Sequence, residues 1–100
     1  MLILLPMDSD DVQEAKLTTV SDAKVWAQVC IEEGEVVEIL HNEKYDGFEK
    51  WSECAVVTHD GESVMNFFNM SMMVLVAHTQ RTVDDIVEAY LFRELHDLAY

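Results

Sequence analysis

The sequence predicts one α/β domain over residues 1–100, built on a mixed β-sheet with helices packed on it. Residues 54–98 have the pattern strand, helix, strand, helix, and the strands 54–59 and 72–78 are apolar on both faces, as parallel strands covered by helices are. Residues 25–41 alternate apolar and polar side chains around a glycine, which is typical of an antiparallel hairpin. One hundred residues supply one core and leave no room for a second domain.

The first half of the chain is expected to supply three strands. The apolar run Met1–Leu5 forms the first, and a polar loop follows over residues 8–22. Residues 25–31 place apolar side chains at every second position, so the two faces of this strand differ. Gly34 suits a tight turn, from which residues 36–41 return as the antiparallel neighbour.

The link between the hairpin and the second half is expected to contain a short helical turn. Residues 48–53 place Phe48 and Trp51 at i, i+3 spacing, so both side chains would face the core. After the strand 54–59, a helix is expected to begin near residues 61–63.

The final helix has the clearest pattern. Thr82 resembles a capping residue ahead of two acids, and an apolar stripe continues through Leu95 to Leu98. His96 then falls in the last turn, where a partial positive charge complements the helix dipole. We interpret His96 as structural, together with His41, which is expected at the opposite edge of the sheet.

Composition and charge exclude several functions. Twenty acidic residues against six basic ones give a formal net charge of −14, so we expect no nucleic-acid partner. Met1–Leu5 is too short for a membrane span or a signal-peptide core, so we expect no membrane partner and a cytoplasmic location. Cys30 and Cys54 form no C-x-x-C motif, so we expect reduced, buried thiols.

A functional site is predicted at the carboxyl edge of the sheet. His59 and His78 each come just past an apolar strand, which is where open α/β sheets bind ligands. Two imidazoles suit zinc, iron, nickel or copper, so these histidines are the candidate metal ligands. Further cofactor contacts are expected from Asp8, Thr58, Asp60 and Ser63. The alternative is that these polar residues only mark where the chain turns into water.

The order of elements resembles that of a known family. A strand ending in Pro6-Met7-Asp8, a hairpin turning at Gly34, and the strands 55–58 and 73–77 with their helices are similar to the dinitrogenase iron–molybdenum cofactor accessory family, which includes NifX-like and NifB C-terminal domains. The resemblance implies a ribonuclease H-like three-layer fold with a five-stranded mixed sheet. In that sheet the strand order is 3-2-1-4-5, and strand 2 is antiparallel to the others. It also implies a transition metal or an iron–sulfur- or molybdenum-type cluster as cofactor.

One diagnostic segment of that family differs here. Members typically carry His-Phe-Gly-Arg-Ala-Pro-Tyr-Phe entering the second strand, and residues 19–26 match it only at Ala23. Thr19 and Asp22 stand where the family's histidine and arginine would contact an anionic cluster. The chain therefore resembles a divergent member of the dinitrogenase iron–molybdenum cofactor accessory family.

Three functions from different classes fit these patterns. We predict a small non-enzymatic accessory or carrier domain that binds a metal or metal cofactor at the carboxyl edge. The alternative is an acidic protein–protein interaction module without a cofactor that uses its acidic surface or the exposed hairpin edge. For either function we expect a monomer or a weak homodimer. A metal-dependent hydrolase built on Asp8 and Asp60 is the third, and no third carboxylate can be assigned to it.

Overall fold

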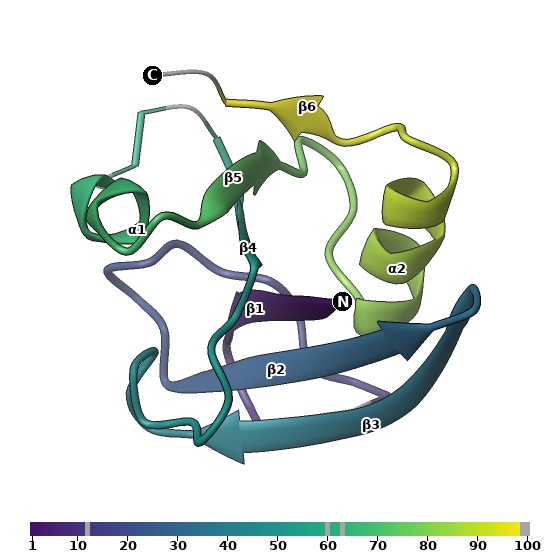
Figure 1. Cartoon of the computed structure of the whole chain (residues 1–100), viewed down its shortest axis with the longest axis horizontal. Coiled ribbons are helices and arrows are strands. Elements are labelled where there is room, and N and C mark those ends of the chain that lie inside the picture. Colours follow the sequence, from purple (N-terminus) through teal and green to yellow (C-terminus); the bar gives the residue numbers. More distant parts are fainter. Residues whose placement is uncertain (12, 60, 63, 99–100) are drawn as a thin grey trace.

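In the part of the chain that the structure describes, six strands form one mixed sheet in the order β3-β2-β1-β4-β5-β6 (Figure 1). The structure, a computed structural model, describes residues 1–11, 13–59, 61–62 and 64–98. β1, β4 and β5 are parallel, whereas β2 is antiparallel to β1 and β3, and β6 is antiparallel to β5. Neither helix in this part of the chain has the length and apolar character to cross a membrane. In chain order the elements are β1 (Leu2–Met7), β2 (Val25–Glu32), β3 (Glu35–Asn42), β4 (Cys54–Val57), α1 (Met65–Asn69), β5 (Met73–Val76), α2 (Val83–Leu91) and β6 (His96–Asp97).

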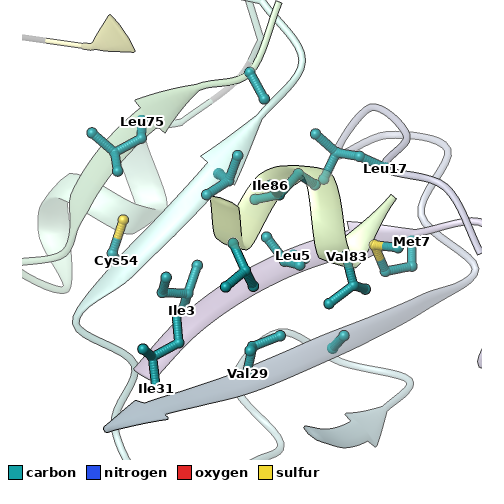
Figure 2. Packing of buried hydrophobic residues seen from close by; sticks show 14 of the residues in the cluster. Ile3, Leu5, Met7, Leu17, Val29, Ile31, Cys54, Leu75, Val83 and Ile86 are labelled. Carbon is teal, nitrogen blue, oxygen red and sulfur yellow. The ribbon is translucent and has the colours of Figure 1, made fainter. Parts of the chain in front are cut away.

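The four inner strands β2, β1, β4 and β5 are mostly buried on both faces, as their apolar side chains predict, whereas β3 and β6 at the two edges are largely exposed. Side chains alternate along β1, so Leu5 belongs to the apolar cluster on the α2 face and Leu4 to the cluster on the α1 face. Figure 2 shows the α2 face, on which Val83 and Ile86 lie over Leu5. The two helices therefore cover opposite faces, and Figure 1 shows them on either side of β4 and β5.

The predicted hairpin is confirmed. β2 and β3 are joined by Glu33 and Gly34, whose φ angles are 53° and 80°. Two consecutive positive φ angles define the type I′ turn that matches the twist of paired strands. The alternation of β2 is confirmed as well, since Val29 faces the α2 cluster and Trp26 faces the α1 cluster.

The sheet has six strands where five were predicted, because the end of the chain leaves the helix early. α2 stops at Leu91, and Arg93 adopts a left-handed conformation with φ of 59°. The N–H groups of Arg93 and Glu94 donate to the carbonyls of Tyr90 and Ala89, the bonding pattern of a Schellman motif. The placement of His96 in a last helical turn is therefore wrong, because this residue begins β6.

Two predictions between the hairpin and α1 are also wrong. Residues 48–53 form no helical turn, and Trp51 is 62% exposed, with its indole Nε1 donating to the carbonyl of Met70 at 3.1 Å. The helix expected near residues 61–63 begins only at Met65. The i, i+3 spacing of apolar residues occurs here without a helix, since Phe48 packs on the α1 cluster and Trp51 does not.

The two cysteines are free, and they differ in burial. Cys54 is buried in β4, and this burial, with the negative charges of Asp97 and Glu53, raises the pKa of its thiol to about 12. Cys30 is only half-buried. Because the thiolate is the reactive form, we expect Ellman's reagent at pH 8 to modify Cys30 quickly and Cys54 only after unfolding. The Cys30→Ser variant should lose the fast phase, and a fast phase that persisted there would contradict this assignment.

Candidate functional site

The carboxyl ends of β1, β4 and β5 meet at one edge of the sheet, as the predicted topology requires. β4 and β5 end at the same level, and His59 and His78 each follow two residues later. Asp8 directly follows β1. β3 also ends at this edge, because it runs parallel to β1 with the antiparallel β2 between them. His41 therefore lies at the same edge and not at the opposite one, separated from β4 by two strands.

Asp8 holds the loop that follows β1. Its carboxylate Oδ1 accepts a hydrogen bond from the backbone N–H of Lys16 at 2.9 Å, and its own N–H donates to the carbonyl of Lys16 at 3.0 Å. The side chain is exposed, so a cation at this edge could still reach the carboxylate. Of the other three predicted cofactor contacts, Asp60 and Ser63 lie outside the described residues, and Thr58 lies within them.

Thr58 is buried at the end of β4 and is bound by a residue that the sequence did not single out, Glu62. Glu62 Oε2 accepts from the Thr58 hydroxyl at 2.5 Å and from the Thr58 N–H at 2.6 Å. Its other oxygen accepts from the N–H of Val20 at 2.6 Å. The carboxylate thus ties the loop after β4 to the loop before β2. Both hydrogen-bond donors of Thr58 are used within the protein, so this buried residue could contact a ligand only as a hydrogen-bond acceptor.

Hydrogen bonding keeps Glu62 ionised. Burial alone would raise the pKa of its carboxyl, but hydrogen bonds from the Thr58 hydroxyl and from the N–H groups of Val20, Thr58 and His59 outweigh burial and lower the pKa below its usual 4.5. The loop that carries His59 is therefore closed by a carboxylate that is charged at neutral pH.

His59 is exposed, and one of its ring nitrogens is engaged. Nδ1 accepts a hydrogen bond from the N–H of Gly61 at 3.1 Å. In a neutral imidazole only one nitrogen accepts, so this bond places the proton on Nε2. A metal-ligating histidine normally donates from its other nitrogen instead. His59 can bind a metal through either nitrogen only after the bond to Gly61 breaks.

His78 lies beside a histidine from another element. Its ring centre is 6.0 Å from that of His96, with 48° between the ring planes, and both side chains are exposed. β6 brings them together, because His96 pairs with Val76 at the end of β5. The sequence missed this pair because it placed His96 in a helix. Among the described residues no group of three or more histidines, cysteines or carboxylates is arranged to hold a metal ion.

A separate hollow of about 430 Å³ lies between α2 and the β5–β6 pair. Its lining is mixed, with Met73, Leu75, Tyr90 and Leu95 as its larger apolar surfaces and Arg93 and Asp97 at its charged positions. None of the predicted site residues lines it. The hollow and the carboxyl edge are therefore distinct features of the surface.

Comparison with known proteins finds similarity in structure. No protein-family model matches the sequence, and no curated protein matches it. The crystal structure of a protein from Methanocaldococcus jannaschii with the provisional name dinitrogenase matches with a TM-score of 0.77 and 19% identity, over 99% of this chain and 95% of that one. The NMR structure of a provisionally named NifB protein from Thermotoga, of the DUF35 family, matches with a TM-score of 0.71 and 15% identity, over 99% and 94%.

This chain has the fold of these two proteins. The match extends over nearly the whole length of each chain, so the similarity applies to the fold as a whole. At 15–19% identity the similarity is one of fold, and the binding chemistry has to be argued from the residues of this chain.

Proposed function

We propose that this protein is a small accessory or carrier domain that binds a transition metal or metal cofactor at the carboxyl edge of its sheet. In this proposal it is a divergent, ribonuclease H-like relative of the iron–molybdenum cofactor biosynthesis proteins and has no enzymatic activity. The observation that carries the proposal is the pair of exposed imidazoles, His59 and His78, that follow the adjacent parallel strands β4 and β5. The shared fold with the provisionally named dinitrogenase and NifB proteins supports it.

The charge of the chain favours a cation over an anionic cluster as the bound species. A net charge of −14 concentrates cations near the surface and repels anions. Thr19 and Asp22 offer no positive side chain where an anionic cluster would need one. Imidazole is the ligand that zinc, nickel, copper and ferrous iron share.

A carrier function fits the exposure of these ligands. Two histidines supply only part of a coordination shell, so water or a partner's side chains would complete it. A shell that is open on one side allows transfer of the metal to an acceptor. Asp8 uses one carboxylate oxygen to close the loop to Lys16, which leaves the other oxygen to join the shell of a bound cation.

An NMR titration of the reduced protein with zinc, nickel and ferrous iron tests the proposal. We expect saturable shifts of amide and imidazole resonances confined to the carboxyl edge around His59 and His78. The shifts should vanish in the His59→Ala/His78→Ala double variant and persist in the His41→Ala control, which removes a histidine on β3, a strand that β2 and β1 separate from β4. Diffuse shifts over the acidic surface would rule out a site at this edge.

The alternative function, an acidic interaction module, is favoured by the exposed edge of β3. Within the described residues this eight-residue strand pairs with β2 alone, and its Val37 is 55% exposed. Glu35 and Glu38 flank Val37 on the same strand, so the fitting partner is a basic extended segment that adds a strand to the sheet. A lysine-rich extended peptide should bind with an affinity that falls steeply with salt, and a glutamate-substituted peptide should not bind. Equal binding of both peptides would exclude this function.

A further inference from the structure

We propose that His78 and His96 together form a binding site for a single divalent late transition-metal ion, bridging β5 and β6. The inference deepens the proposed function and rests on it, since it names the ligand pair and the class of metal. It differs in one testable respect, because His96 takes the place of His59 as the second ligand.

The two histidines lie on the same face of an antiparallel pair. His96 is opposite Val76, and His78 is two residues further along the path of β5, so the two side chains form a diagonal pair. Diagonal neighbours across antiparallel strands are close enough for long side chains to meet. The ring centres are 6.0 Å apart. Figure 1 shows β6 lying directly beside β5, so the pair depends on the strand that the sequence did not predict.

The separation suits two ligands of one ion. A metal–nitrogen bond of about 2.0–2.1 Å plus a ring radius of about 1.1 Å puts each ring centre about 3.2 Å from the metal. Two imidazoles on a tetrahedral ion are then about 5.2 Å apart, and on a linear ion about 6.4 Å. The observed distance lies between these values. Both side chains are exposed, so a small rotation closes the difference for a tetrahedral ion.

The backbone at both ligands is held in place. The guanidinium of Arg81 donates to the carbonyls of Ala77, Gln80 and His78 at 2.8, 2.8 and 3.1 Å, which fixes the turn after β5. On the other strand, the N–H of Leu98 donates to the carbonyl of Val74 at 2.9 Å and holds β6 against β5. A site on fixed backbone loses little freedom when the metal binds.

His59 is less suited than His96 to be the second ligand. Its Nδ1 already accepts from Gly61 at 3.1 Å, and both of its nitrogens become available only when that bond breaks. The ring centres of His78 and His96 are 6.0 Å apart. A metal ion bound between these two rings leaves the hydrogen bond between His59 and Gly61 intact. Imidazole ligands select Cu²⁺, Ni²⁺ and Zn²⁺ over Mg²⁺ and Ca²⁺, and Cu²⁺ should bind most tightly.

Calorimetric titration of the reduced chain with NiCl₂ and ZnCl₂ near pH 7.5, with thermal melts at each metal concentration, tests the site. The wild-type chain should bind one ion and should melt at a higher temperature as the metal concentration rises. His78→Ala and His96→Ala should each weaken binding about tenfold or more and lose the shift in melting temperature. His41→Ala, which removes a histidine that neither ligand pair uses, should bind as the wild type does. His59→Ala separates the two ligand pairs, because unchanged binding in this variant assigns the second ligand to His96 and lost binding assigns it to His59. MgCl₂ should give no signal with any of them.

The outcomes separate this inference from the proposed function. If His59→Ala and His78→Ala lose binding while His96→Ala keeps it, the His78–His96 site is excluded and the predicted His59–His78 pair stands. If the wild-type chain shows no saturable binding of either metal, both are overturned. Because a change in β6 could alter folding, amide NMR spectra of His96→Ala and of a second variant, His96→Gln, establish that the sheet is intact before binding is compared.

Discussion

Replacing Phe67 by alanine is expected to lower the free energy of unfolding by about 3–5 kcal/mol, a large share of the stability of a domain of this size. Phe67 is 2% exposed and is the buried residue of α1. Its ring makes edge-to-face contacts with Trp26 and Tyr45, at centroid distances of 5.9 and 5.5 Å. Alanine would lose these contacts and leave a cavity between α1 and the sheet.

The length of α1 adds to the expected effect. A helix of five residues is not stable alone, so its stability comes from the contacts of its buried face. Without Phe67, α1 is expected to unfold locally before the rest of the domain. The loop that carries His59 precedes α1 directly, so this variant should also disturb the carboxyl edge.

Urea denaturation followed by tryptophan fluorescence and circular dichroism measures the loss. The matched control is Phe92→Ala, the same substitution at a residue that is 70% exposed, for which we expect a change of about 0.5 kcal/mol or less. Phe67→Leu keeps most of the apolar contact and should lose less than half as much as Phe67→Ala. Similar losses for the alanine variants at positions 67 and 92 would contradict the packing described here.

The strands could be predicted from the sequence because their pattern has one physical meaning. A buried parallel strand has to be apolar on both faces, and β4 and β5 are. The period of two in β2 and the glycine at position 34 leave few alternatives to a hairpin. Strand order is not contained in such patterns, and here the resemblance to a family correctly supplied the order 3-2-1-4-5 within the six-stranded sheet.

The end of the chain was predicted wrongly because its apolar spacing has two meanings. In a helix, Leu95 and Leu98 lie on one face, whereas in an extended chain a separation of three places them on opposite faces. The structure has the second arrangement, with Leu95 packed on the α2 cluster and Leu98 on the α1 cluster. The stop signal was hidden as well, because the left-handed residue that ends α2 is Arg93, where glycine is usual.

The position of the candidate residues at the strand ends could be predicted from the sequence, but their contacts could not. Strand ends place His59 and His78 at the carboxyl edge, and this follows from topology alone. The pairing of His78 with His96 depends on β6, and the role of Glu62 depends on a contact with Val20, 42 residues away in the chain. Contacts of this range have no local sequence pattern, so they became visible only in the structure.

Substituting glutamine for Glu62 is expected to lower the free energy of unfolding by about 1–3 kcal/mol at pH 7. Both carboxylate oxygens accept hydrogen bonds, one from Val20 and the other from Thr58. A glutamine amide has only one accepting oxygen, so its NH₂ group would face the N–H of a neighbour. Glu62→Ala removes all of these bonds, and it should destabilise the protein at least as much. Because Glu62 is partly exposed, solvent limits the effect to this range.

The pH dependence distinguishes a charged acceptor from a packing effect. The folded-state pKa of Glu62 is lowered, so its ionised carboxylate stabilises the fold above the unfolded-state value of 4.5 and loses that contribution as pH falls through the folded-state pKa. The difference in unfolding free energy between the wild type and Glu62→Gln should therefore be largest at neutral pH and shrink below pH 4.5. Urea titrations at a series of pH values, with the exposed Glu49→Gln as control, measure it. A difference that stayed constant down to the acid limit would show that the charge of Glu62 does not close this loop.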